Sequence, residues 1–196
     1  MLKIKIDIKK YSKIFLILLF IFASVFILLQ LTGKYILPSF LVGQDSIIST
    51  STQIEKLLDK KAPYFDLSDN LGGRIKLSQY TNTPVVVVFW ATWNQESADQ
   101  IKIIDDFIAN QKQSDLVKVI AINSQEDESV AKSFIRRGGY KVLFALDKTG
   151  ITSSSYDIKS LPSTFFIDKS GIIREIYTGI LSEKMIVDKI ENILNK

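Results

Sequence analysis

The chain has 196 residues, of which 46% are hydrophobic, and it contains no cysteine and no histidine. The missing cysteines exclude disulfides, thiolate nucleophiles and sulfur-ligated metal sites, and the missing histidines exclude imidazole catalysis and imidazole metal ligands. Five lysines and one aspartate within residues 1–33 account for the whole net charge of +4. The rest of the chain is therefore balanced, and no nucleic-acid partner is expected, because such binding requires a basic face on a folded domain and the excess charge here lies on a short tail.

A long apolar stretch follows the lysine-rich start of the chain. Residues 14–31 carry no charge, and Ser24 and Gln30 are their clearly polar members. As a helix this stretch would be roughly 27 Å long, close to the thickness of a bilayer core. A buried helix of a soluble domain normally keeps a polar stripe, and this stretch has none. The pattern predicts one transmembrane helix over residues 14–31.

The lysines around this stretch predict its orientation. Residues 1–13 hold five lysines, whereas Lys34 alone follows the stretch closely, so the positive-inside tendency places residues 1–13 in the cytoplasm. The chain is thus predicted to be a single-pass protein of the cell membrane with an extracytoplasmic C-terminal part. A cleaved signal peptide is the competing interpretation, although its apolar part usually spans about 7 to 15 residues and ends at a small-x-small site. Residues 32–60 are predicted as a juxtamembrane spacer and residues 61–196 as one globular domain.

Strand and helix patterns alternate in the predicted domain. Strands are expected over Tyr64–Leu67, Arg74–Leu77, Val85–Trp90, Leu116–Ile122, Val142–Leu146, Ser163–Asp168 and Ile172–Tyr177. Helices are expected over Glu96–Asn110 and Ser129–Arg137, and a last helix after Ser182 should turn Met185, Ile186, Ile190 and Leu194 inward. The continuous apolar run at 85–90 is typical of a strand buried on both faces. The order of elements predicts an α/β fold with a mixed central sheet and helices on both faces.

The turn after Trp90 is the place where this fold would bind a ligand. Ligands of such sheets usually meet the C-terminal ends of the central strands. The helix that follows would present free N–H groups there, which can stabilise an anion. No glycine pattern resembles a nucleotide-binding loop and no acidic spacing resembles a calcium loop, so neither a cofactor nor a metal is expected.

The segment VVVVFWATWNQES at residues 85–97 resembles the active-site segment of the membrane-anchored TlpA/ResA-type thiol-disulfide oxidoreductases. In that AhpC/TSA-Redoxin-like family, FWATW precedes a C-x-x-C motif. Further matches are APYFDL at 62–67, LPSTFFID at 161–168 and a closing hairpin at 171–177. The resemblance covers roughly residues 61–196, and it implies a thioredoxin-like fold preceded by an anchor.

The two cysteines of the family would fall at Asn94 and Ser97. Thiol-disulfide exchange needs a thiolate that attacks a disulfide and a second thiol that resolves the mixed disulfide. Neither residue can supply one, and no histidine is present to activate Ser97. The chain is therefore predicted to have no catalytic residue of the family type, although it resembles a family of oxidoreductases.

The resemblance also implies a peptide-binding surface, which does not depend on the cysteines. The resemblance makes Pro162 a cis-proline beside the turn at Trp93, and in the family the backbone before that proline pairs with an extended peptide. That pairing would need only the main chain of Leu161. A loop proline that merely rigidifies the fold is the alternative. Glu126 falls about where the family places a glutamate near its cysteines, and an ordinary solvated acidic loop is the alternative there.

Two classes of function follow from these observations. The leading hypothesis is a redox-inactive module that binds a segment of an exported protein, with the candidate binding residues Trp93, Asn94, Ser97, Glu126, Leu161 and Pro162. The alternative is an oxidoreductase-family protein that acts in cell redox homeostasis or cytochrome c maturation with thiols supplied by a partner. A structural spacer without a specific ligand also stays open.

Overall fold

The computed structural model describes residues 19–21, 24, 56–110 and 112–196. The predicted tail at 1–13, most of the predicted anchor at 14–31 and most of the predicted spacer lie outside these residues. Among the residues that are described, no helix is both long and apolar enough to cross a bilayer. The chain divides into two compact units, Met1–Gln44 and Asp45–Lys196, and the fold below belongs to the second.

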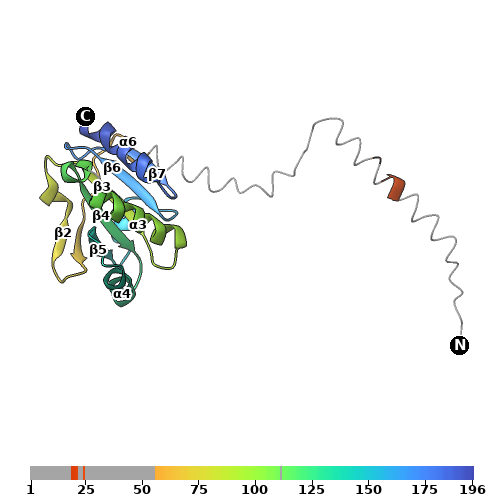
Figure 1. Ribbon diagram of the computed structural model, residues 1–196, viewed down its shortest axis with the longest axis horizontal. Coiled ribbons are helices and arrows are strands. Elements are labelled where there is room, and N and C mark those ends of the chain that lie inside the picture. The colour runs from red at the N-terminus through yellow and green to blue at the C-terminus, as the bar shows by residue number, and fades with distance from the viewer. Residues whose placement is uncertain (1–18, 22–23, 25–55, 111) are drawn as a thin grey trace, which may run out of the picture. The chain divides into compact units, whose positions relative to one another are not determined.

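A seven-stranded mixed sheet forms the centre of this domain (Figure 1), with the strand order β2-β1-β5-β4-β3-β6-β7. The strands are β1 (Asp66–Asp69), β2 (Arg74–Lys76), β3 (Val85–Trp90), β4 (Lys118–Ser124), β5 (Leu143–Asp147), β6 (Ser163–Ile167) and β7 (Ile173–Thr178). Strands β3, β4 and β5 are parallel, and the remaining pairs are antiparallel. The predicted α/β class with a mixed sheet is confirmed.

Helices cover both faces of the sheet. They are α3 (Gln95–Asn110), α4 (Glu128–Gly138), α5 (Ile151–Ser155) and α6 (Glu183–Leu194), with the 3-10 helices η2 (Leu77–Tyr80) and η3 (Lys112–Leu116). Buried residues of α3, α4 and α6 join one apolar cluster, and residues of η2 and Tyr156, which directly follows α5, join the cluster on the other face. The short helices α5, η2 and η3 were not expected from the sequence.

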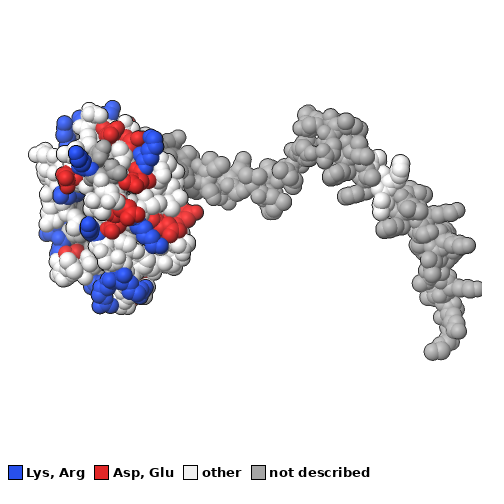
Figure 2. Space-filling model, viewed as in Figure 1, with Lys and Arg blue, Asp and Glu red and all other residues white. Residues whose placement is uncertain are grey.

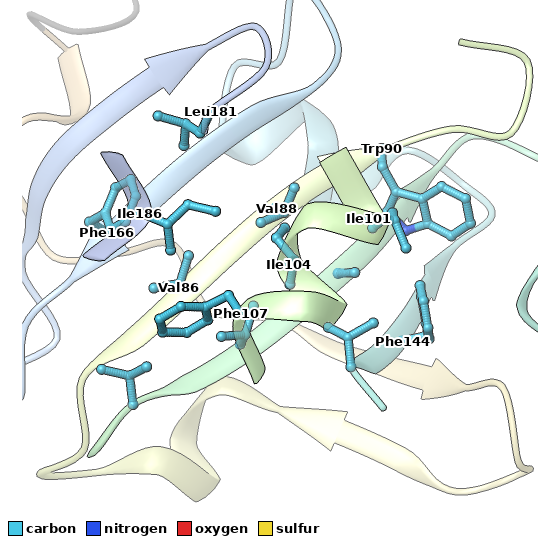
Figure 3. Packing of buried hydrophobic residues seen from close by; sticks show 14 of the residues in the cluster. Val86, Val88, Trp90, Ile101, Ile104, Phe107, Phe144, Phe166, Leu181 and Ile186 are labelled. Atoms are coloured by element: carbon cyan, nitrogen blue, oxygen red, sulfur yellow. The ribbon is translucent and has the colours of Figure 1, made fainter. Parts of the chain in front are cut away.

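Strand β3 supplies both cores because its side chains alternate between the two faces of the sheet. Val86, Val88 and Trp90 enter the cluster beneath α3, and Figure 3 shows them pointing toward that helix. The other three residues of β3 enter the opposite cluster. Every residue of β3 is buried, as expected for the apolar run at 85–90.

The last helix packs with a slightly different face from the predicted one. Ile186 and Ile190 are buried as expected, but the third fully buried residue is Ile193. Met185 and Leu194, which were expected to face inward, are only partly buried against the same cluster. Ser182 caps this helix, since its side chain accepts a hydrogen bond from the N–H of Met185.

Candidate functional site

The candidate site is the turn between β3 and α3. Trp90 ends the strand and is completely buried, with its ring 5.1 Å from that of Phe134 and 5.5 Å from that of Phe144. Three residues later Trp93 is 70% exposed. The two tryptophans are only three positions apart, but the first lies in the core and the second on the surface.

Asn94 caps α3. Its Oδ1 accepts a hydrogen bond of 2.7 Å from the N–H of Ser97, and its carbonyl accepts one of 3.2 Å from the N–H of Ala98. An asparagine side chain at this position satisfies one of the N–H groups that the first turn of a helix leaves without a partner. The cap therefore uses an N–H group that an anion at the helix start would otherwise attract.

Ser97 lies in the first turn of α3 and is completely buried. Its hydroxyl has no hydrogen-bond partner among the described residues. A serine becomes a nucleophile when a base removes its proton, and here no base contacts the hydroxyl. Burial and the missing base together exclude Ser97 as the nucleophile in this arrangement.

Glu126 is held against the turn by three hydrogen bonds. Its carboxylate accepts from the N–H of Thr92 at 3.0 Å, from the Thr92 hydroxyl, and from the side-chain amide of Asn123 at 2.8 Å. These bonds join the loop after β4 to the loop after β3, because the two strands are parallel neighbours and end at the same edge of the sheet. Glu126 thus differs from a solvated acidic side chain, and it positions the backbone just before Trp93.

Pro162 completes the turn from the neighbouring strand. The Leu161–Pro162 peptide bond is cis, as the resemblance implied, and Pro162 is buried. Phe89 pairs with Ser163 in the antiparallel register of β3 and β6, which places Pro162 beside the C-terminal end of β3. The carbonyl of Pro162 accepts a hydrogen bond of 2.8 Å from the N–H of Gly179.

A groove of about 310 Å³ lies between the turn that carries Trp93 and the segment that leads to Leu161. Its lining residues are Trp93, Ser124, Gln125, Ser153, Ile158, Lys159, Ser160 and Leu161. We call it the Trp93–Leu161 groove. Within the described part of the chain, the main chain of Leu161 forms no hydrogen bond, so its N–H and carbonyl remain available at the rim.

A buried polar network supports one wall of this groove. Asp147 ends β5, is 1% exposed, and accepts hydrogen bonds from the N–H of Ser153 at 2.7 Å and from its hydroxyl at 2.8 Å. The hydroxyls of Ser153 and Ser124 are 3.0 Å apart. Because a buried carboxylate is stable only when hydrogen-bonded, this network fixes the start of α5 against the sheet. Asp147, Ser153 and Ser124 are not among the site residues predicted from the sequence.

The structure therefore brings some of the predicted site residues together and separates others. Trp93 and Leu161 line one groove, although they are far apart in the sequence. Asn94 and Ser97 contact each other within the first turn of α3. Glu126 acts on the turn through Thr92 and is not among the lining residues of the groove. Within the described residues, no acidic cluster is arranged to hold a metal ion.

A buried strand that leads into a capped helix, faced by a cis-proline from the next strand, defines a thioredoxin-like domain. The profile of the AhpC/TSA family matches residues 58–176, which is more than half of the chain. The chain therefore belongs to the AhpC/TSA family, as a TlpA/ResA-type thioredoxin-like protein without the two redox cysteines.

Individual relatives agree with this assignment. Thiol-disulfide oxidoreductase ResA of Geobacillus kaustophilus is 27% identical over 171 residues, which make up 87% of this chain and 92% of that protein. ResA of Bacillus thuringiensis is 31% identical over 127 residues, or 64% of this chain and 73% of that protein. Among solved structures, one described as a thiol:disulfide interchange protein DsbE from Chlorobium tepidum matches with a TM-score of 0.61 at 28% identity, covering 68% of this chain and 99% of that one. The family expected from the sequence is confirmed.

Proposed function

We propose that this chain is a membrane-tethered, redox-inactive thioredoxin-like domain that binds an extended segment of another exported polypeptide in the Trp93–Leu161 groove. One contrast carries the proposal. The groove and its cis-proline are complete, while the two cysteine positions of the family are filled by a helix cap and a buried hydroxyl. The domain has thus kept the surface of an oxidoreductase without its reactive groups.

The chemistry of the site supports the redox-inactive half of the proposal. Thiol-disulfide exchange proceeds through a mixed disulfide, and each step transfers a bond between sulfur atoms. This chain has no sulfur atom outside its two methionines, and a thioether cannot form a disulfide. A redox reaction at this surface would need both thiols from partners.

The rim of the groove supports the binding half. An extended peptide can pair with the unbonded main chain of Leu161 as if it added a short strand, with side chains placed alternately into the groove and toward solvent. Trp93, which lines the groove, leaves 70% of its surface exposed to solvent. Exposed aromatic residues beside a concave surface are typical of sites that bind partners.

The tether is supported by the sequence. The apolar stretch at 14–31 is long enough to span a bilayer, and the lysines before it favour a cytoplasmic N-terminus. The folded domain would then lie on the extracytoplasmic side, where it meets exported polypeptides.

Fluorescence provides a direct test of binding, because Trp93 is exposed and Trp90 is buried. Iodide should quench Trp93 and leave Trp90 bright in the full chain in detergent micelles. A reduced and carboxymethylated unfolded protein, which presents extended segments without thiols, should protect Trp93 from iodide. It should give no protection if the groove does not bind extended chain, and that result would overturn the proposal.

Variants locate the binding to the groove. With a fluorescein-labelled carboxymethylated protein as ligand, Trp93→Ala should weaken binding by on the order of tenfold, since a central aromatic anchor often dominates an interface. Leu71→Ala is the matched control, because Leu71 is 88% exposed at the tip of the β1–β2 hairpin. Equal loss in both variants would indicate nonspecific apolar adsorption instead of a site.

An insulin-reduction assay separates the proposal from the oxidoreductase alternative. The full chain should show no rate above that of dithiothreitol alone. The double substitution Asn94→Cys/Ser97→Cys should create activity, because the turn, the helix start and the cis-proline are all in place. Activity of the unsubstituted chain would refute the redox-inactive assignment.

A further inference from the structure

Helix α4 carries a cluster of cations that the groove does not use. Lys132, Arg136 and Arg137 lie on the helix, and Lys141 follows it on the surface. We call these four residues the α4 basic surface. Figure 2 shows the basic side chains gathered over α4, at the lower end of the domain in that view.

The helical repeat explains why these cations share a face. Ala131 and Ile135 turn into the core. Residues three or four positions apart share one face of a helix, so the residues opposite this pair form a common outer face toward solvent. That outer side holds Lys132, Arg136 and Arg137 together with two small serines. An apolar face turned to the core and a polar face turned to solvent are common to surface helices, and here the polar face is basic toward the C-terminal end of the helix.

The cations are poorly neutralised within the domain. Lys132 is paired with Glu128 at 2.9 Å, and Arg136 contacts the hydroxyl of Ser133 at 3.4 Å. Among the described residues, the side chains of Arg137 and Lys141 have no ion-pair partner. From the neighbouring helix α3, Asp105 accepts a hydrogen bond from the backbone N–H of Lys141. One or two cations suit the C-terminus of a helix dipole, and this surface holds more than that role requires.

We propose that the α4 basic surface docks the domain onto anionic lipid headgroups of the membrane that carries it, and so orients the Trp93–Leu161 groove. This inference rests on the tether in the proposed function. A flat, anionic occupant fits better than a protein, because serines separate the cations and the face offers no exposed aromatic anchor of the kind that centres a protein interface.

The strength of the interaction matches a tethered domain. Each cation near an anionic membrane is worth roughly fivefold in affinity, so three cations give about a hundredfold. Such an affinity is too weak to recruit a free protein, but a tether raises the local concentration to the millimolar range and makes it sufficient. It also leaves the docking reversible by salt.

Docking at the C-terminal end of α4 would set the height of the groove above the membrane. The helix begins at Glu128, two residues after Glu126, which holds the Thr92 turn, and it ends at Gly138. Its length is roughly 16 Å. With the C-terminal end of α4 on the membrane, the candidate site is held about that far above the headgroups and stays open to an extended chain.

The absence of cysteine makes the test clean, since a single introduced cysteine can be labelled without background. The full chain carrying Ser133→Cys is labelled with a fluorophore and placed in nanodiscs that contain a headgroup-linked acceptor. One set of nanodiscs is phosphatidylcholine alone, and the other contains about a third phosphatidylglycerol. Ser155→Cys on α5 is the reference label, because the adjoining Tyr156 packs in the cluster on the opposite face of the sheet from α4.

Energy transfer from residue 133 should rise at least threefold in anionic nanodiscs at low salt and return to the neutral level in 0.5 M salt, as expected for screened surface charges. The reference label should not follow this pattern. Arg136→Glu/Arg137→Glu should abolish the rise, whereas Lys169→Glu/Lys184→Glu, with the same change in net charge elsewhere on the surface, should preserve it. Equal transfer in both nanodiscs, or a rise that survives the α4 charge reversal, would overturn the docking proposal.

Two further outcomes are distinguishable. Co-elution of the chain with neutral nanodiscs reports insertion separately, so an inserted chain without anionic-dependent transfer refutes the docking and leaves the tether intact. A chain that fails to insert refutes both. If a poly-glutamate peptide binds in a manner that depends on Arg136 and Arg137 while anionic nanodiscs have no effect, the surface binds protein and the lipid proposal is wrong.

Discussion

The side-chain oxygen of Asn94 accepts a 2.7 Å hydrogen bond from the N–H of Ser97, and these are the two positions at which the sequence resemblance places the cysteines of the family. In a redox-active relative the first of these positions needs an anionic sulfur, which the N–H groups and the dipole of the helix start stabilise. Here the neutral side-chain amide of Asn94 accepts the hydrogen bond from the N–H of Ser97. The first turn of α3 is therefore stabilised as structure by the same groups that would activate a thiolate.

Replacement of Asn94 should show how much this cap contributes. Asn94→Ala should lower the free energy of unfolding by about 1 kcal/mol, because the N–H of Ser97 loses its partner. Asn94→Asp should retain the stability or raise it slightly, since a carboxylate accepts the same bond and suits the positive end of the helix dipole. Urea denaturation of the full chain in micelles, followed by the fluorescence of buried Trp90, measures both. An unchanged midpoint in Asn94→Ala would show that solvent replaces the cap at no cost.

Ser97→Ala should stabilise the domain, in contrast to Asn94→Ala. The hydroxyl of Ser97 is completely buried without a partner, and removal of an unsatisfied buried polar group relieves a desolvation penalty. We expect the free energy of unfolding to rise by on the order of 1 kcal/mol, with binding in the Trp93–Leu161 groove unchanged. Ser154→Ala, at an exposed position of α5, is the control and should leave the midpoint where it is. Loss of binding in Ser97→Ala would mean that the hydroxyl reaches the ligand.

Glu126 offers a test of how the turn before Trp93 is held. Glu126→Ala leaves the N–H of Thr92 and the amide of Asn123 without their acceptor, so the free energy of unfolding should fall by about 2 kcal/mol. Glu126→Gln keeps one oxygen acceptor and should lose about half as much. Because Glu126 acts through Thr92, affinity for the extended ligand should fall in parallel with the order of the turn, and iodide quenching of Trp93 reports that order. Asp127→Ala removes a cap of α4 instead, and it should lower stability without altering that quenching.

The acidic loop shows what the sequence could and could not predict. The sequence shows three consecutive carboxylates at 126–128. It does not reveal their hydrogen-bond and ion-pair partners, because each partner depends on the tertiary fold or on the exact start of the helix. In the structure Asp127 accepts from the N–H of Ser129 as the cap of α4, and Glu128 pairs with Lys132. Only Glu126 reaches across to β3, and its contact with Thr92 spans 34 positions of sequence.

Local patterns predicted the strands and long helices because a buried strand and an amphipathic helix each leave a periodic signature. The five residues of α5 are too few for such a signature, so this helix and the groove wall that it forms were missed. A local clue was present in Gly150, whose left-handed φ of 73° starts α5 directly after the loop of β5. The shift from Leu194 to Ile193 as the buried residue of α6 is likewise below what helical periodicity resolves, because both positions border the apolar stripe.

Tyr156 gives a prediction on the pH dependence of stability. Its ring is fully buried among Phe65, Phe89 and Phe165, and its hydroxyl donates a 2.9 Å hydrogen bond to the carbonyl of Pro63. Burial raises the pKa of Tyr156 well above the ordinary value of 10.0. The folded state therefore keeps the neutral phenol, while the unfolded chain ionises near pH 10. The contribution of this residue to stability is complete below pH 10 and declines as the pH rises further.

The matching substitution is Tyr156→Phe. At pH 7 it should lower the free energy of unfolding by about 1 kcal/mol through the lost hydrogen bond. Above pH 10 the unsubstituted chain should lose stability more steeply than Tyr156→Phe, by about 1.4 kcal/mol at pH 11, so the two denaturation midpoints converge and then cross. Urea titrations from pH 8 to pH 11 measure this difference, and the other tyrosines cancel because both chains share them. Parallel curves for the two chains across this range would show that the phenol of Tyr156 reaches solvent and ionises in the folded state.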